Sequence, residues 1–414
     1  MRVNLEREAL AEAVAWTARM LPGRPVLPVL SGLLLQAQPG TLTISCFDYE
    51  VSARIAVDAE VAEPGTALVP GRLLAEITRS LPPLGVEIAQ GADDLTLTCG
   101  EAAFSLVMLP LGEYPRLPEL PRPAGTVDGG MLAAAISQVT PSASRDDTLP
   151  VLTGVNMEID GGMITLVATD RYRLAVRELA WQPERPGTRC TPLVPARTLA
   201  EAARMTAPGV PVQIMTGAEQ APGGAAAGAP RGPDAVIGFS SGGRRLTTRL
   251  LGTEYIRYAS RFPRDFGSCA EMPAARLAEA VRRVALVAER GSSVRLSFGG
   301  GTVTIEAGTK GQARAREIVA AEFSGDESVI AFSPQYLLDG LSAALTAAAG
   351  HSAGQQRDGV PANPAVPAAD AARIRLQFTS PAKPALITGH AGPGDEAAPD
   401  FRYLLVPLRA LQAT

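Results

Sequence analysis

A serine in the pattern G-x-S-x-G can attack a carbonyl group, and residues 238–242 (Gly-Phe-Ser-Ser-Gly) match that pattern. The motif needs a strand before the serine and a helix after it, because the sharp turn between them exposes the nucleophile. The segment that follows, residues 244–250, reads as a strand instead. The only two histidines, His351 and His390, lie in segments that we expect to be loops. The pattern therefore predicts a hairpin turn, not a hydrolase.

The other potentially reactive side chains do not indicate a catalytic site either. Residues 380–383 (Ser-Pro-Ala-Lys) have S-x-x-K spacing, but two prolines within five residues disfavour the helix that this motif usually begins. No metalloprotease, P-loop or strand-coupled dinucleotide-binding motif occurs. The four cysteines are far apart, without a C-x-x-C pair, which indicates neither a disulfide framework nor a zinc site: Cys46, Cys99, Cys190 and Cys269. We expect no catalytic residue, metal or cofactor, and an enzyme is the less favoured alternative.

The composition is that of a folded protein with several domains. The 414 residues are 46% apolar and 19% charged, and the net charge of −4 excludes a generally basic nucleic-acid coat protein, although not a local basic surface. Only Lys310 and Lys383 are lysines, which together with many Gly, Pro and Ala residues indicates a GC-rich genome. The chain has no apolar run long enough to span a membrane, and acidic residues occupy the start, where a signal peptide would be apolar. These features predict a cytoplasmic protein.

The chain contains an internal repeat, which decides its organisation. Residues 27–32 (L-P-V-L-S-G) recur at 149–154 (L-P-V-L-T-G), and 69–76 (V-P-G-R-L-L-A-E) recur at 194–201 (V-P-A-R-T-L-A-E). A more diverged third copy begins near residue 272. We therefore expect three modules, at residues 1–122, 123–263 and 264–414.

Each module is predicted to contain two helices and several strands, an α+β arrangement. In the first copy, apolar spacing and turn residues predict helices over 5–20 and 73–81 and strands over 32–37, 41–45, 51–57, 86–89, 95–98 and 104–108. Two segments rich in Gly, Pro and Ala, 216–234 and 346–372, are predicted to be inserted surface loops.

Four stretches resemble the bacterial β sliding clamp family, the processivity factors of DNA polymerase III. They are 24–32 (R-P-V-L-P-V-L-S-G), 168–174 (A-T-D-R-Y-R-L), 194–197 (V-P-A-R) and 403–409 (Y-L-L-V-P-L-R). The resemblance implies three clamp modules that form a half-ring, and two chains that close head to tail around duplex DNA. It also implies that the chain tethers the replicative polymerase subunit, the clamp loader and other clamp-motif proteins for processive synthesis. The alternative is a protein-binding repeat scaffold that does not encircle DNA.

A clamp that slides must attract phosphates without recognising bases, which suits arginine. The candidate DNA contacts are arginines on the helix-bearing segments, namely Arg24, Arg72, Arg79, Arg197, Arg204, Arg282 and Arg283, with Arg276 as a further candidate. Arg24, Arg72 and Arg197 are favoured, because the resemblance places Arg24 at a DNA-contacting position of the family and the other two occupy equivalent positions of the repeat. Glu12 departs from the family, because many clamps carry a basic residue there.

The family also has a partner pocket, which holds a short motif through one or two large apolar side chains. The resemblance maps its walls to Leu152, Thr169, Arg171, Tyr172, Arg173, Leu174, Ala382, Pro384, Leu404, Val406, Pro407, Leu408 and Arg409. Two departures fall on the rim, since Ile256 stands where proline is usual and Arg261 where a small aliphatic residue is usual. Four residues, 411–414, also extend past the usual end. We expect weaker binding of cyclic peptide inhibitors; a housekeeping clamp and a specialised or inhibitor-resistant second copy both remain open.

The closing edge of the dimer is likewise inferred from the resemblance. It would bring Phe104 and Leu106 of one chain against Leu286 and Val287 of the other.

Overall fold

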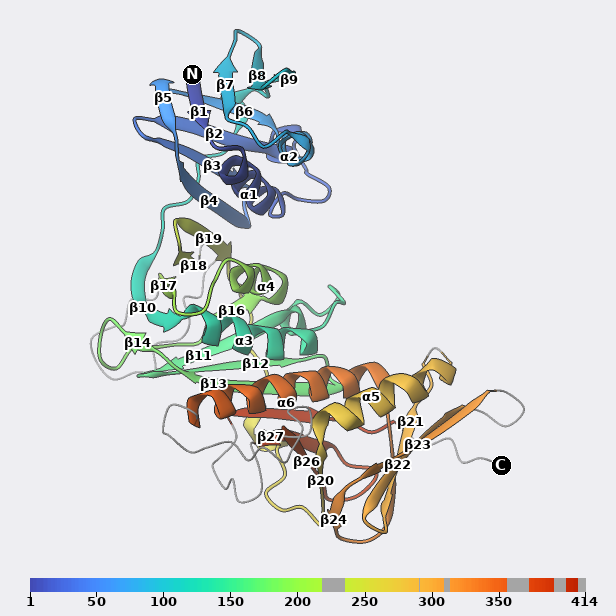
Figure 1. Ribbon diagram of the computed structural model, residues 1–414. Coiled ribbons are helices and arrows are strands. Elements are labelled where there is room, and N and C mark those ends of the chain that lie inside the picture. The colour runs from blue at the N-terminus through green and yellow to red at the C-terminus, as the bar shows by residue number, and fades with distance from the viewer. Residues whose placement is uncertain (218–234, 290, 309–312, 356–371, 391–399, 409–414) are drawn as a thin grey trace. The chain divides into compact units, whose positions relative to one another are not determined.

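The computed structural model describes residues 1–217, 235–289, 291–308, 313–355, 372–390 and 400–408. By its internal contacts the chain forms two compact units (Figure 1). The N-terminal unit comprises residues 1–129, 182–188 and 204–250. The C-terminal unit comprises residues 130–181, 189–203 and 251–414.

The N-terminal unit carries helices α1 (Arg7–Ala18) and α2 (Gly71–Ser80), which pack against each other. An antiparallel sheet has the order β5 (Glu60–Glu63), β1 (Arg2–Leu5), β7 (Val86–Gln90), β8 (Asp94–Cys99) and β9 (Ala102–Val107). A nine-stranded sheet has the order β14 (Gln182–Pro183), β10 (Arg122–Asp128), β17 (Pro211–Thr216), β18 (Val236–Ser241), β19 (Arg244–Arg249), β4 (Val51–Asp58), β3 (Thr41–Phe47), β2 (Gly32–Gln38) and β6 (Gly65–Pro70). The β19–β4 pairing joins the first repeat to the second, so that neither strand leaves an open edge there.

The C-terminal unit is built in the same way around α3 (Gly129–Val139), α4 (Ala196–Arg204), α5 (Ala274–Val284) and α6 (Pro334–Gln355). Its large sheet has the order β15 (Arg189–Cys190), β11 (Gly154–Asp160), β12 (Met163–Thr169), β13 (Arg173–Ala180), β28 (Phe401–Leu405), β27 (Ala385–His390), β26 (Arg373–Phe378), β20 (Ser268–Pro273) and β24 (Glu322–Ser324), with β16 (Leu193–Pro195) also on β11. A four-stranded sheet has the order β23 (Arg314–Ala320), β22 (Thr302–Gly308), β21 (Val294–Gly299) and β25 (Ser328–Phe332).

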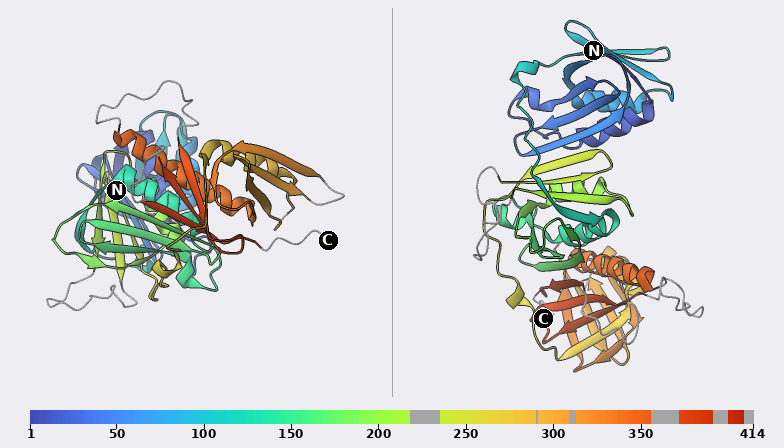
Figure 2. Two further views of the ribbon diagram at one scale, coloured as in Figure 1. Left: turned by 90° about the horizontal axis from the view of Figure 1, so that it is seen from below. Right: turned by 90° about the vertical axis from the view of Figure 1, so that its left-hand side faces the viewer.

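Helices α5 and α6 pack side by side, and α6 lies on β26, β27 and β28 (Figures 1 and 2). The helices α2, α4 and α5 are amphipathic: in α2, Leu74 and Ile77 are buried while Arg72 and Arg79 are exposed. Among the described residues, no helix is both long and apolar enough to cross a membrane.

Apolar spacing and turn residues predict the two helices and six of the strands of the first copy, although β5 and β6 were not predicted. The hairpin predicted at 238–242 is confirmed as the turn between β18 and β19. Gly242 and Gly243 have φ of 55° and 77°, which two-residue hairpin turns require and glycine adopts without strain. The N-terminal strand β1 was not predicted, and it shortens the first helix so that it begins at Arg7.

Three expectations about loops are wrong. Residues 346–355 belong to α6, because the alanine-rich sequence that looks like low complexity is also a strong helix former. His351 therefore lies in a helix, and His390 ends strand β27. Thr216 ends strand β17, while residues 218–234 and 356–371 lie outside the described residues.

Candidate nucleic-acid surface and partner pocket

The repeated L-P-V-L-[S/T]-G stretches form equivalent turns that lead into strands. Each begins a short 3-10 helix, Pro28–Ser31 in the first copy and Pro150–Thr153 in the second, and the glycine then starts β2 or β11. A Cβ atom on Gly154 would come within 2.7 Å of Leu193 and 2.8 Å of Leu251. Glycine is thus needed at this position for close packing, and Leu152, at the end of the turn, is buried.

The T-D-x-x-R sequence forms the turn between β12 and β13. The Asp170 carboxylate accepts hydrogen bonds from the backbone N–H groups of Tyr172 (3.0 Å) and Arg173 (3.1 Å). The Thr169 hydroxyl donates to the Arg173 carbonyl at 2.6 Å. These bonds hold Arg171 in the left-handed region, at φ 79°, which is unfavourable for a residue with a Cβ atom. The motif is therefore a turn that displays Arg171 and Tyr172 while Arg173 points inward.

Arg173 joins this turn to helix α6. Its guanidinium forms ion pairs with Asp170 (3.0 Å) and Asp339, donates to the Pro141 carbonyl, and lies 4.3 Å from the centre of the Tyr336 ring. Burial by itself would lower the pKa of Arg173, but Tyr403 and the two carboxylates outweigh burial and raise it. The side chain is only 8% exposed, so Arg173 lies behind the surface of the predicted pocket and offers little of itself to a ligand.

The floor of the predicted pocket follows from strand register. Thr169, Leu174 and Leu404 are direct neighbours on β12, β13 and β28, and all three are buried. Beyond them, the Val406 N–H donates to the Tyr172 carbonyl at 2.9 Å. Tyr172 and Val406 remain 49% and 36% exposed, so apolar surface is open to a ligand at this point. The Tyr172 ring stacks on that of Tyr336.

The structure brings part of the predicted pocket together through these contacts. Ala382 and Pro384 precede β27 and are exposed and half-buried, respectively, while Pro407 and Leu408 follow β28 and are half-buried. The Leu408 N–H donates to the Ala331 carbonyl at 2.8 Å. Arg409 lies outside the described residues.

One wall is a segment that we call the strap, residues 251–267, which runs from the end of β19 to β20. Four half-buried aromatic side chains pack on the hydrophobic cluster of Val167, Leu174, Val176, Leu386 and Leu404; they are Tyr255, Tyr258, Phe262 and Phe266. Ile256 is 40% exposed, and Arg261 is exposed in the short 3-10 helix Ala259–Arg261. The sequence did not reveal this aromatic spacing as a wall, although its aromatic residues three and four apart were a visible signal.

The arginines predicted to contact DNA are exposed, but they differ in their surroundings. In the N-terminal unit, Arg24 and Arg79 are exposed, and Arg72 donates from α2 to the Pro22 carbonyl at 3.1 Å, beside the loop that carries Arg24. Glu12 on α1 is paired with Arg244, whose guanidinium lies 6.0 Å from the Trp16 ring centre. The unusual acid at position 12 is therefore partly neutralised within its own unit.

In the C-terminal unit, Arg197 on α4 and Arg282 on α5 are exposed. Arg283 points instead to β23, where its Nε lies 3.0 Å from Glu317, and it also pairs with Glu279. The hydrogen bond from Arg283 lowers the pKa of Glu317. Because these two carboxylates already neutralise Arg283, it has less charge available for another anion than an unneutralised arginine would have. Arg204 and Arg276 are exposed and also engage other groups of the chain.

Strands β9 and β23 each lie at the edge of a sheet. Among the described residues, β9 pairs only with β8, and β23 pairs only with β22. On β9, Leu106 is 2% exposed and Phe104 is half-buried, whereas Val107 is 74% exposed. Leu106 therefore supports its own core, and Val107 replaces it as the outward apolar side chain. Near β23, Leu286 is 84% exposed and Val287 is half-buried.

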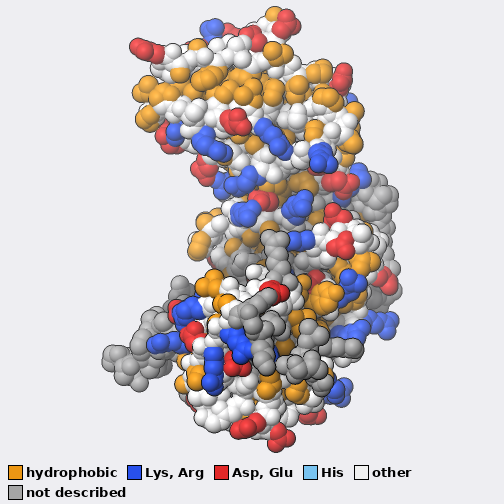
Figure 3. All heavy atoms as spheres, turned by 90° about the vertical axis from the view of Figure 1, so that its right-hand side faces the viewer, with side chains coloured by type: hydrophobic (Ala, Val, Ile, Leu, Met, Phe, Trp, Pro, Cys, Tyr) orange, Lys and Arg blue, Asp and Glu red, His pale blue; other side chains and the backbone are white. Residues whose placement is uncertain are grey.

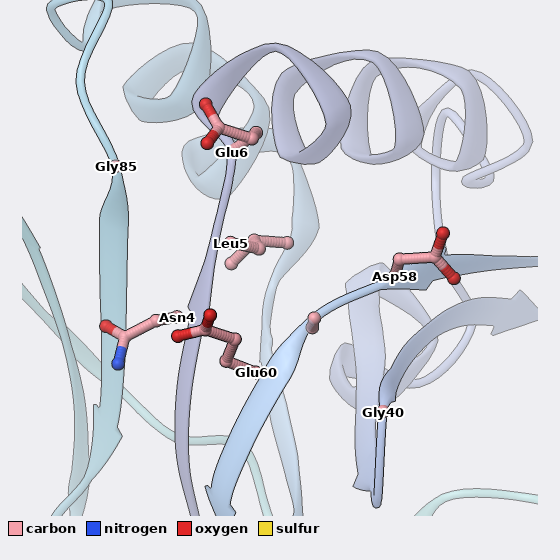
Figure 4. Close-up of a pocket in the computed structure, with 8 residues that line it drawn as sticks. Asn4, Leu5, Glu6, Gly40, Asp58, Glu60 and Gly85 are labelled. Carbon is pink, nitrogen blue, oxygen red and sulfur yellow. The ribbon is translucent and has the colours of Figure 1, made fainter.

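Figure 4 shows an open notch in the N-terminal unit, lined by Asn4, Glu6, Asp58 and Glu60. The carboxylates come from the start of α1 and from the corner between β4 and β5, and they point in different directions. Within the part of the chain that is described, no group of three or more His, Cys, Asp or Glu residues is placed to hold a metal ion.

The fold defines a protein of tandem α+β modules, in which the exposed apolar surface of Tyr172 and Val406 lies beside the buried row of Thr169, Leu174 and Leu404. Three family models match in succession: the N-terminal domain of the DNA polymerase III beta subunit at residues 1–118, its central domain at 126–256 and its C-terminal domain at 259–349. The chain belongs to this family, the bacterial β sliding clamps, which are non-catalytic processivity factors.

Relatives with this name cover the whole chain. The β sliding clamp of Streptomyces coelicolor is 46% identical, and the β sliding clamp homolog GriR of Streptomyces muensis is 40% identical, each over 99% of both chains. Among solved structures, the sliding clamp of Bacillus subtilis has a TM-score of 0.81 at 23% identity, and the Pseudomonas aeruginosa clamp bound to griselimycin has 0.79 at 26% identity. Each alignment covers 99% of both chains.

Proposed function

We propose that two copies of this chain close head to tail around duplex DNA and tether the replicative polymerase for processive synthesis in the cytoplasm. The observation that carries the proposal is the repeat itself, which gives successive modules an exposed arginine at the same helix start, Arg72 in α2 and Arg197 in α4. Arginines on helices attract phosphates without recognising sequence. Figure 3 shows arginine and lysine side chains on the surface of each unit.

The open edges support ring closure. Strand β9 of one copy and β23 of another each offer unpaired backbone groups beside apolar side chains, notably Val107 and Leu286. Such edges are usually protected, and pairing between copies would satisfy both. In the view of Figure 3, a band of hydrophobic side chains also crosses the N-terminal unit.

The test is retention on DNA of different topology. A closed ring, assembled on nicked circular DNA by a clamp loader, should remain bound through gel filtration and be released when the circle is cut. Its solution mass without DNA should be that of a dimer. Equal retention on circular and linear DNA would contradict encirclement, and a protein-binding scaffold would show no retention on either.

We also propose that Thr169, Leu174, Leu404 and Val406 form the floor of a pocket for a short linear motif of the polymerase, the clamp loader and other partners. A leucine or phenylalanine side chain gains roughly 1.5–3 kcal/mol when it leaves water for such a floor. The exposed Tyr172 and Val406 offer the apolar surface at which it would enter.

The strap gives this pocket its own ligand preference. Proline would fix φ at position 256, whereas isoleucine keeps an N–H group and adds a branched side chain. Arg261 brings a long cation to a wall that is usually aliphatic, and it can pair with an acidic ligand residue. Large cyclic peptides that lie across the wall should therefore lose more affinity than a linear motif anchored on Leu174 and Val406.

Affinities for one linear peptide, one cyclic peptide inhibitor and griselimycin, which the related Pseudomonas aeruginosa clamp binds, test this preference. The variant Ile256→Pro/Arg261→Val should bind the cyclic peptide roughly 5- to 150-fold more tightly and the linear peptide about equally. Equal gains for both peptides, or none for either, would show that these residues do not set the preference.

A further inference from the structure

The strap contacts the sheet beside the proposed pocket floor, not on the floor itself. Side chains on one face of the sheet form lateral rows across β11, β12, β13 and β28. The first row holds the pocket floor of Thr169, Leu174 and Leu404. The next row holds Asn156, Val167, Val176 and Arg402, and the third holds Glu158, Thr165 and Glu178. The face thus changes from apolar to polar within two rows of the pocket.

The second and the third row each contain a residue that contacts the strap. The Tyr258 hydroxyl donates to Glu158 Oε2 at 2.8 Å, and the Asn156 amide donates to Glu158 Oε1 at 3.0 Å. Each oxygen of the Glu158 carboxylate therefore has a donor, and one of them belongs to the strap.

A second fastening lies at Phe262. The Arg402 guanidinium lies 5.1 Å from the centre of its ring and donates to Glu178 Oε1 at 2.6 Å. This contact holds the strap by a ring face, which permits sliding, whereas the hydrogen bond to Glu158 specifies both distance and direction.

We propose that Glu158, acting through Tyr258, is a positioning residue that sets the height of the strap over the pocket and so selects the peptides that the pocket accepts. The inference rests on the proposed partner pocket. Tyr258 lies two residues after Ile256 and three before Arg261, so one anchor controls both rim residues. Glu158 does not belong to the floor row. It can therefore affect the ligand only through its contact with the strap.

The test compares Tyr258→Phe with Tyr114→Phe. Tyr114 also uses its hydroxyl in one hydrogen bond, as acceptor from the Phe47 N–H at 2.8 Å, but it lies in the N-terminal unit. The probe is a fluorescent linear pentapeptide ending in leucine and phenylalanine, measured by anisotropy, and the melting temperature of each variant is recorded. We expect Tyr258→Phe to raise the peptide Kd roughly 5- to 10-fold, and Tyr114→Phe to leave it unchanged.

Glu158→Gln, which keeps an acceptor for the tyrosine hydroxyl, should retain most of the affinity, whereas Glu158→Leu should match Tyr258→Phe. Adding Tyr258→Phe to Glu158→Leu should cause no further loss, because both remove the same bond. Unchanged affinity in Tyr258→Phe, or additive losses in the double variant, would overturn the inference. If the unaltered protein binds the peptide and Leu174→Asp abolishes binding, the pocket stands whatever Tyr258→Phe does. If the unaltered protein does not bind, the pocket and the positioning role both fall.

Discussion

Replacing Arg173 with methionine removes the charge that joins the β12–β13 turn to α6 while keeping most of the side-chain volume. The guanidinium serves Asp170, Asp339 and the Pro141 carbonyl at once, and the Arg173 and Asp170 side chains are 8% and 11% exposed. Removing one partner of a buried ion pair costs about 3–5 kcal/mol, because the other charge stays buried without compensation. Asp339 is 22% exposed and can be reached by water, so we expect the lower end, about 3 kcal/mol.

Thermal unfolding measures this loss. For a folded unit of this size, each kcal/mol lowers the melting temperature by about 2–4 °C, so Arg173→Met should melt roughly 6–12 °C lower. The chain provides a matched control in Arg189, whose Nε lies 2.7 Å from Asp160, with side chains 70% and 66% exposed. Arg189→Met should melt as the unaltered protein does, because water already solvates both groups of that pair.

A second replacement separates the buried charge from general damage to packing. Adding Asp339→Leu to Arg173→Met removes one of the two carboxylates that have lost their cation, and should recover part of the lost stability. Similar shifts for Arg173→Met and Arg189→Met, or no recovery in the double variant, would refute the argument that burial makes the Arg173 network important.

Three further outcomes follow from other parts of the chain. Leu286→Lys should sediment as a monomer, because it places a charge in the apolar contact that we propose closes the ring; an unchanged dimer would show that the contact lies elsewhere. Charge reversal of Arg24 and Arg197 together should weaken DNA binding equally on all sequences and reduce its salt dependence, and the reversal of Arg283, already paired with Glu317, should do less. Burial raises the pKa of the Cys46 thiol from 9.0 to about 12, so the folded state keeps a proton that the unfolded state loses above pH 9. The free energy of unfolding should therefore fall as pH rises from about 9 towards 12, and a Cys46→Ala variant should show a smaller fall in alkaline denaturation.

The sequence alone determined that the chain consists of repeated α+β modules, because repeats, helix periodicity and turn motifs depend on residues that are close along the chain. T-D-x-x-R specifies a turn through its aspartate, and L-P-V-L-[S/T]-G supplies the glycine that close packing requires. The amphipathic V-P-x-R helices bury their apolar residues and expose their arginines. The resemblance assigns Thr169, Tyr172 and Leu174 to one site, and a single turn holds the three residues together.

Only the tertiary structure decided which side chains meet across long separations. Arg173 and Asp339 are 166 positions apart, and nothing local indicates that they pair. The same holds for the choice of Glu317 by Arg283, for the inward orientation of Leu106, and for the strap, whose anchor on Glu158 depends on register between distant strands. Strand pairing and buried ion pairs stabilise the fold only after the loops between their residues have closed. The sequence next to such a residue therefore does not indicate which distant residue it will pair with.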